Sequence, residues 1–199
     1  NNGFDVVING IADETIMKVI DGIIQNKDLS LIPNIMIKKD NEIILTEKNK
    51  ITNKFNLLDY PDRSLVDIKK YMDTRTMITS RGCIGKCSFC TTPTFFGIWN
   101  GKESNKVVAE IEYLINKFNT KKIIFLDDNM TVNKERMYDI CNEIEKRNIK
   151  CLFGCLSSIA CYDKSMFEKM YSVGFRWVHF GIETGSERIL KLMNKQMNL

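Results

Sequence analysis

The chain has 199 residues, of which 44% are hydrophobic, so it can bury a core for one domain or for parts of two. Its 29 basic and 25 acidic residues are spread without blocks and give a formal net charge of +4, which offers no electrostatic case for nucleic-acid binding. No apolar run approaches the roughly 20 residues of a membrane span, and the first residues lack the layout of a secretory signal.

Cysteine usage suggests the compartment in which the protein works. The sequence has seven cysteines, an odd number, and three of them are clustered. This pattern favours free thiols in a reducing compartment over a disulfide framework. We therefore expect a cytoplasmic protein.

Residues 1–60 predict a small unit with one helix and three short strands. The apolar run Asp5–Gly10 predicts a strand, and Asn34–Lys38 with Glu42–Glu47 predict a hairpin. Between them, apolar residues recur every three or four positions, as on one face of a helix: Ile16, Val19, Ile20, Ile23 and Ile24. Such a unit buries little surface, so we expect it to complete a domain that begins before it.

Regular alternation of strands and helices begins after a predicted linker, residues 61–75, which contains Pro61 among mixed polar residues. The four predicted strands are Thr76–Ser80, Lys122–Asp127, Lys150–Ser157 and Trp177–Glu183. Each is followed by a predicted helix, within residues 104–118, 133–147, 163–174 and 186–193. Four such βα units predict a parallel sheet with right-handed crossovers that curves toward a TIM-barrel-like barrel.

Three cysteines in the loop after the first of these strands form the most informative motif. Cys83, Cys87 and Cys90 lie within eight residues, so their thiolates can converge on one soft metal centre. A structural zinc site usually takes four ligands from two pairs, and no second Cys-x2-Cys pair occurs in the sequence. On a [4Fe-4S] cluster, three cysteines hold three irons and leave the fourth iron free to bind a small molecule.

Polar residues follow the other predicted strands as well. In parallel α/β sheets, ligands collect in the loops at the carboxyl ends of the strands. These strand-end residues are Asp127, Asp128 and Asn129, then Ser157 and Ser158, then Glu183, Thr184 and Gly185. Four polar clusters on one rim, one of them a triplet of thiols, predict a binding site.

Residues 83–90 resemble the signature of the radical S-adenosylmethionine superfamily, Cys-x3-Cys-x-aromatic-Cys, with Phe89 as the aromatic residue. The approach Arg81-Gly82 and the runs at residues 125–128 and 180–186 resemble the branch that carries a cobalamin-binding domain before its radical domain. The resemblance covers nearly the whole chain.

This resemblance implies a fold class: an α/β chain with a partial (βα) radical barrel of four parallel βα units. It implies that residues 1–60 are the C-terminal end of a Rossmann-like cobalamin-binding domain with a β-hairpin, and that residues 76–199 begin an incomplete barrel of the six-unit type. The cobalamin ligand motif of the branch, Asp-x-His-x-x-Gly, does not occur in this sequence. Cobalamin is therefore implied only for a longer parent chain.

The resemblance also implies the reaction. A [4Fe-4S] cluster on the three cysteines would bind S-adenosylmethionine and cleave it reductively to a 5′-deoxyadenosyl radical for C-H activation. Cobalamin-dependent methyl transfer or rearrangement is the implied outcome, on a small-molecule or peptide substrate. An electron donor such as flavodoxin or ferredoxin is the implied partner.

Individual cofactor contacts follow from the same resemblance. Phe89 would lie against the adenine, and Asp127 or Asp128 would hold the methionine amine. Glu183 would contact the ribose hydroxyls, and Lys195 the carboxylate end. Ser157, at the end of the third strand, completes the candidate cofactor-binding residues.

Two other interpretations stay open. A methylthiotransferase has similar runs in its barrel, but that family has a further cysteine triplet in its first domain, and residues 1–75 contain no cysteine. A three-thiolate module that stores or senses iron or zinc would be the non-enzyme interpretation.

The remaining cysteines and the single histidine favour structural roles. Cys151 and Cys155 would lie about 13 Å apart on a strand, at ~3.3 Å per residue, so they cannot share one metal. We expect Cys141, Cys151, Cys155 and Cys161 to be buried apolar thiols, and His179 to be a hydrogen-bonded core residue.

Overall fold

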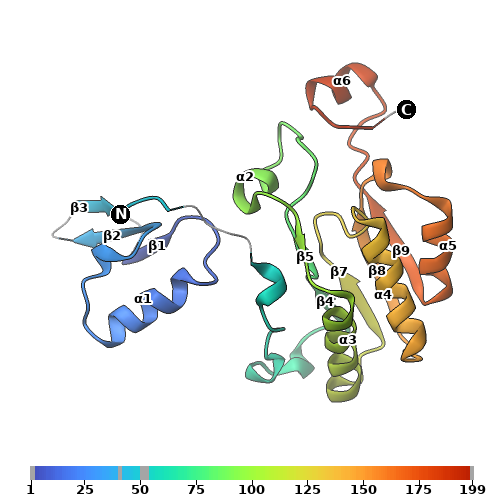
Figure 1. The fold of residues 1–199 in the computed structure, drawn as a ribbon, viewed down its shortest axis with the longest axis horizontal. Coiled ribbons are helices and arrows are strands. Elements are labelled where there is room, and N and C mark those ends of the chain that lie inside the picture. Colours follow the sequence, from blue (N-terminus) through green and yellow to red (C-terminus); the bar gives the residue numbers. More distant parts are fainter. Residues whose placement is uncertain (1–2, 40–41, 50–53, 198–199) are drawn as a thin grey trace. The chain divides into compact units, whose positions relative to one another are not determined.

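The structure is a computed structural model that describes residues 3–39, 42–49 and 54–197. The chain forms two compact units, Asn1–Asn53 and Lys54–Leu199 (Figure 1). The sequence led us to extend the first domain to residue 60, but the chain divides earlier. Phe55 is buried, and the guanidinium carbon of Arg81 lies 4.5 Å from the centroid of its ring. The Asn56 side chain accepts a hydrogen bond from the backbone N–H of Glu103. These contacts attach residues 54–60 to the second unit.

The first unit is an antiparallel three-stranded sheet in the order β1-β2-β3 with one helix. Its elements are β1 (Val6–Ile8), α1 (Thr15–Ile24), β2 (Ile35–Lys39) and β3 (Glu42–Leu45). The predicted hairpin is confirmed, because β2 pairs with β3 from Met36 to Lys39, although its turn at residues 40 and 41 lies outside the described residues. The predicted helix is confirmed as α1. Val19 of its apolar stripe is buried, and four isoleucines of the stripe are exposed: Ile16, Ile20, Ile23 and Ile24.

The second unit contains a four-stranded parallel sheet in the order β4-β7-β8-β9. Its strands are β4 (Thr74–Met77), β7 (Lys122–Phe125), β8 (Leu152–Ser157) and β9 (Phe175–Phe180). The crossover helices α3 (Ser104–Phe118), α4 (Lys134–Lys146) and α5 (Lys164–Ser172) lie side by side along this sheet (Figure 1). The short helices are α2 (Thr92–Phe96), after the cysteines, and α6 (Glu187–Leu192), after β9. The four predicted βα units are confirmed.

All four strands differ from their predicted bounds by two or three residues, and β4 and β9 differ at both ends. β4 begins at Thr74, inside the predicted linker, and the chain then turns into a separate two-residue strand, β5 (Ser80–Arg81), which pairs with β6 (Asn100–Gly101). β9 begins earlier than predicted because Gly174, at φ 116°, ends α5 directly before it. Because β9 ends at Phe180, Glu183 lies beyond the strand, in a loop and at φ 64°.

The hydrophobic core between the parallel sheet and its helices is one continuous cluster of buried side chains. The apolar faces of α3 and α4 are packed into this core, and a ring stack of Phe125, Phe153 and Phe175, with centroids 5.2 to 5.8 Å apart, joins three strands. Close packing of this kind holds the strand ends at fixed positions. Within the described ranges, no helix is long and apolar enough to cross a membrane.

Candidate active site

A cavity of about 460 Å³ opens at the carboxyl ends of the parallel strands. Its walls come from the cysteine loop, from the residues after β7 and β8, from the end of β9, and from the segment after α6. The structure brings together eight of the nine predicted site residues in this lining: Cys83, Cys87, Phe89, Cys90, Asp128, Ser157, Glu183 and Lys195. A larger cavity of about 610 Å³ lies at the opposite ends of β8 and β9 and contains none of them. In βα folds chemistry concentrates at the carboxyl rim, so the smaller cavity is the candidate site.

The three clustered thiols face the same space. The Cys83 Sγ accepts a hydrogen bond of 3.3 Å from the Gly85 backbone, and a Cβ added at Gly85 would lie 3.4 Å from that sulfur and 3.9 Å from the Cys87 Sγ. Cys90 donates its backbone N–H to the Cys87 carbonyl at 3.1 Å. Burial raises the pKa of the Cys83 thiol more than the hydrogen bond from the Gly85 N–H lowers it, and the nearby Asp128 carboxylate adds to the increase.

The three thiols are soft donors of the kind that iron–sulfur clusters bind. Among the described residues, no group of three or more His, Cys, Asp or Glu side chains is close enough to hold one metal ion. In a [4Fe-4S] cluster each thiolate binds a different iron, which separates the three sulfurs further. The three thiols that line this cavity are therefore suited to hold a [4Fe-4S] cluster.

The two neighbouring aspartates have different surroundings. Asp128 lines the cavity and accepts hydrogen bonds from the Thr92 side chain and the Gly82 backbone, while partial burial raises its pKa. Asp127 is fully buried and does not line the cavity. Its carboxylate accepts bonds from the Thr79 N–H at 3.1 Å and the Thr79 hydroxyl at 2.8 Å, and burial raises its pKa. Of the two candidates for the methionine amine, only Asp128 is accessible from the cavity.

Glu183 and Lys195 form an ion pair at the cavity. The Lys195 Nζ lies 2.9 Å from the Glu183 Oε1, and the lysine side chain is 11% exposed. Gly181 makes room for this pair, because an added Cβ would lie 2.9 Å from Oε1 and 3.2 Å from Nζ. Each charge therefore has a partner in this structure, and a zwitterionic ligand could exchange with both.

The segment after α6 is bonded to the cysteine loop. The Ser88 N–H donates to the Met193 carbonyl at 2.9 Å, and the Asn194 side-chain amide donates to the Lys86 carbonyl at the same distance. These bonds place Lys195 and Gln196 in the cavity wall beside the thiols. The sequence offers no signal for this contact, because the bonded residues are more than a hundred positions apart.

Two lining residues, Cys161 and His179, were misassigned from the sequence. Cys161 was expected to be a buried apolar thiol, but it is partly exposed in the cavity, and its sulfur lies 3.2 Å from the Asn129 amide nitrogen. His179 was expected in the core, but it is exposed on β9 and lines the cavity. Asn129 is buried and also orients Thr131, whose hydroxyl lies 2.5 Å from that of Ser157. The sequence had placed Asn129 among the polar residues at the end of the second predicted strand, and it lines the cavity.

The fold and the cavity define an α/β protein with clustered thiols at the carboxyl rim of a parallel sheet. The chain belongs to the radical SAM superfamily, whose family model matches residues 77–199. This match confirms the resemblance carried by the cysteine motif.

Individual proteins resemble the chain over nearly its whole length. A protein named as an uncharacterized methyltransferase from Pyrococcus horikoshii is 27% identical over 196 residues, 96% of this chain and 43% of that protein. The anaerobic magnesium-protoporphyrin IX monomethyl ester cyclase of Rubrivivax gelatinosus is 22% identical over 207 residues, 98% of this chain and 37% of the cyclase. The chain thus spans less than half the length of either relative.

A solved structure has the same fold. OxsB, described as a cobalamin-dependent S-adenosylmethionine radical enzyme with aqua-cobalamin and S-adenosylmethionine bound, matches with a TM-score of 0.82 and 20% identity. The match covers 97% of this chain and 30% of OxsB. It confirms the expected partial barrel of four parallel βα units.

Proposed function

We propose that the chain is the cofactor-binding part of a radical S-adenosylmethionine enzyme whose [4Fe-4S] cluster is held by Cys83, Cys87 and Cys90. The observation that carries this proposal is the shared cavity, in which three thiols face polar side chains from three other segments. When bound, the cluster would supply the electron that cleaves S-adenosylmethionine to methionine and a 5′-deoxyadenosyl radical, which then takes a hydrogen atom from the substrate.

The cavity offers a partner for each part of S-adenosylmethionine. Phe89 presents an aromatic face for the adenine, and Asp128 a carboxylate for the methionine ammonium. Lys195 offers a cation for the methionine carboxylate, and Glu183 offers oxygens for the ribose hydroxyls. Ser157 supplies a further hydroxyl on the β8 side. Apolar lining by Ile84, Leu156 and Phe180 would keep water from the radical.

Cobalamin-dependent methyl transfer is the proposed outcome. The name of the Pyrococcus relative supports methyl transfer, and the description of OxsB supports the use of cobalamin. Residues 1–53 would then be the end of the cobalamin-binding domain. Radical cyclisation or rearrangement is the second candidate, which the likeness to the cyclase across 98% of this chain favours. In both cases we propose a small molecule or a peptide as substrate.

The proposed reaction consumes one electron for each S-adenosylmethionine cleaved, so it requires a reductant. We propose a low-potential protein donor, such as flavodoxin or ferredoxin, and a cytoplasmic setting. The free state of all seven cysteines supports a reducing compartment.

Anaerobic reconstitution of the full-length protein tests the function. Iron and sulfide should give a brown protein that converts S-adenosylmethionine to 5′-deoxyadenosine under dithionite. Cys83→Ala, Cys87→Ala and Cys90→Ala should each lose iron, whereas Cys161→Ala, which removes a thiol from the same cavity, should retain it. A colourless protein that binds zinc instead would overturn the proposal. Transfer of deuterium from methyl-labelled S-adenosylmethionine into product would separate methyl transfer from cyclisation.

A further inference from the structure

The cysteine loop spans residues 82–99, and the chain segments before and after it lie next to each other. The Lys102 N–H, after the loop, donates to the Thr79 carbonyl, before it, at 2.8 Å. The ladder between β5 and β6 adds two residue pairs. So short a ladder is at best marginally stable by itself, and other contacts must fix the base of the loop.

On the entry side, Asp127 holds the chain just before the loop. Both of its oxygens lie 3.1 Å from the Thr79 N–H, and its Oδ1 also accepts the hydroxyls of Thr79 and Ser80. All three residues are at most 2% exposed. Hydrogen bonds to a carboxylate are roughly twice as strong as neutral ones, so this end of the loop is firmly attached to the end of β7.

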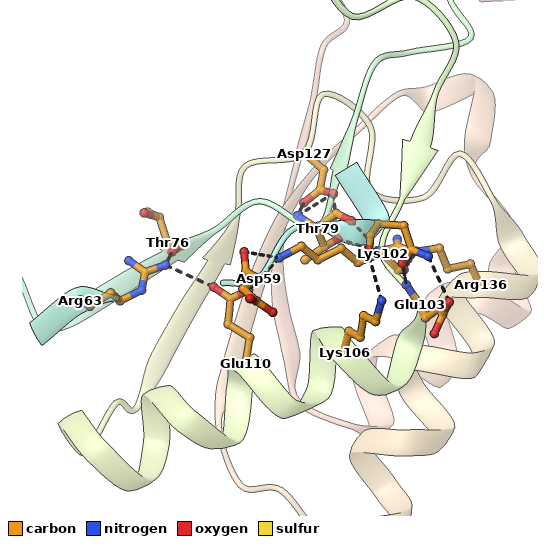
Figure 2. A network of polar contacts seen from close by, with 11 residues as sticks. Asp59, Arg63, Thr76, Thr79, Lys102, Glu103, Lys106, Glu110, Asp127 and Arg136 are labelled. Carbon is orange, nitrogen blue, oxygen red and sulfur yellow. Dashed lines mark hydrogen bonds and ion pairs between the residues drawn. The ribbon is translucent and has the colours of Figure 1, made fainter. Parts of the chain in front are cut away.

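On the exit side, Arg136 of α4 holds the chain just after the loop and reaches back to the entry. Its Nε donates to the Lys102 carbonyl at 2.7 Å, and its Nη2 donates to the Thr79 carbonyl at 2.9 Å and to the Thr79 hydroxyl at 3.0 Å. Figure 2 shows the bonds of Asp127 and of the Arg136 Nη2 meeting at Thr79. The Thr79 hydroxyl thus links the carboxylate and the guanidinium in one buried chain of hydrogen bonds.

We propose that Thr79, Asp127 and Arg136 form a loop clamp that positions the three cysteines for the cluster. The inference rests on the proposed function and adds positioning residues that do not line the cavity. Because the clamp fixes both ends of one loop, loosening it changes the relative placement of the thiols, which lie 4 to 11 residues after Thr79. Asp127 then acts through the loop, while Asp128 remains the residue that faces the cofactor.

Two conservative changes in the full-length protein test the clamp. Thr79→Val keeps the side-chain shape but removes the shared hydroxyl, and Arg136→Lys keeps the charge but removes the forked donor. Arg147→Lys is the matched control, since Arg147 follows α4 and pairs with Glu112 and Glu143 instead. The readouts are the alkylation rates of Cys83, Cys87 and Cys90 in the apoprotein, the electron paramagnetic resonance spectrum of the reduced cluster, and the melting temperature.

Both clamp variants should alkylate at least about fivefold faster at the three cysteines than wild type, as expected when local opening becomes easier. Their cluster spectra should be broadened or shifted, while Arg147→Lys should match wild type in both readouts. Variants that only melt earlier, with unchanged alkylation and spectra, would overturn the clamp and leave the proposed function intact. A wild-type protein that binds no cluster would overturn the proposed function. The alkylation rates of the apoprotein would still decide whether the clamp exists.

Discussion

Lys195 and Glu183 contact each other across the cavity, with Nζ 2.9 Å from Oε1, although one follows α6 and the other follows β9. We assign these two side chains to different groups of the same cofactor, Lys195 to the methionine carboxylate and Glu183 to the ribose hydroxyls. Ligand binding must therefore replace one charge-assisted contact by two.

Lys195→Met should weaken S-adenosylmethionine binding. A hydrogen bond to a charged group contributes about 1.5–3 kcal/mol, which corresponds to a loss of affinity of roughly 10-fold to 100-fold. Equilibrium binding to the reconstituted full-length protein measures this effect. Lys191→Met, on the exposed side of α6, is the control and should bind normally. Equal affinities in both variants would mean that Lys195 only fixes its own loop.

Gly82→Ala should destabilise the protein and reduce its iron content. Gly82 has φ 85°, and an added Cβ would meet the backbone of Trp99 at 3.1 Å and that of Ile98 at 3.2 Å. A left-handed conformation costs a residue with a Cβ about 1–2 kcal/mol, and the backbone contact adds to that cost. Denaturant unfolding and iron analysis measure the two effects.

Gly97→Ala is the matched control for that change. Gly97 also has a positive φ, 67°, but an added Cβ there would have no atom within 4 Å. It should show only the conformational cost and retain more iron. Iron loss as large as in Gly82→Ala would mean that crowding at Trp99 has no special effect on the thiols.

The seven cysteines should differ in reactivity in the folded apoprotein. Burial raises the pKa of Cys141 and of Cys155 to about 12, and that of Cys151 to about 11. At pH 8 a thiol with a pKa of about 12 is ionised to about one part in 10,000, and the thiolate is the reactive form. Iodoacetamide followed by peptide mass mapping should therefore label the cavity thiols first.

Unfolding provides the control for this labelling. In concentrated guanidinium all seven cysteines should react at similar rates, because the burial that raises the three pKa values is lost. Fast reaction of Cys141 or Cys155 in the folded protein would contradict the packing between α4 and β8.

Glu110 should give stability an unusual pH dependence. Its carboxylate lies 3.7 Å from the Lys102 Nζ and 3.5 Å from the Arg63 Nη2 (Figure 2), yet burial outweighs both cations and raises its pKa above 4.5. The folded protein therefore holds this proton when the unfolded chain has released it. The contribution of Glu110 to the free energy of unfolding falls as pH rises from 4.5 through the raised value.

Comparison with Glu110→Gln isolates this contribution. The difference in unfolding free energy, wild type minus variant, should decrease as pH rises through that interval. A difference that instead increases with pH would mean that Lys102 and Arg63 outweigh burial. Denaturant unfolding at several pH values decides between the two.

Sequence patterns predicted the parallel sheet well because its helices carry continuous apolar stripes. Val107, Val108, Ile111 and Leu114 of α3 are completely buried, as their spacing indicated. The exposed isoleucines of α1 show the limit of this reasoning, because periodicity reports a capacity for burial and not the area available to cover it. The strand shift at β9 has a local cause, the left-handed Gly174, which the pattern of apolar residues does not encode.

Residues of the candidate site could be predicted from the sequence where they directly follow one strand. They could not be predicted where their role depends on contacts between distant segments. The cysteines and Asp128 follow from motif and topology. The separate role of Asp127 depends on donors from Thr79 and Ser80 and on Arg136, which sequence spacing does not bring together. Cys161 was misassigned because a thiol in a loop carries no signal of which side it faces.

The bonds from Ser88 to Met193 and from Asn194 to Lys86 join residues 105 and 108 positions apart. Contacts with such long sequence separation carry the largest loop-closure cost and raise the contact order, so they form late in folding. The wall that contains Lys195 should therefore assemble only after the sheet and its helices exist. Any factor that delivers iron and sulfide would then bind a nearly native chain. The last step of folding would close the site around the assembled cluster.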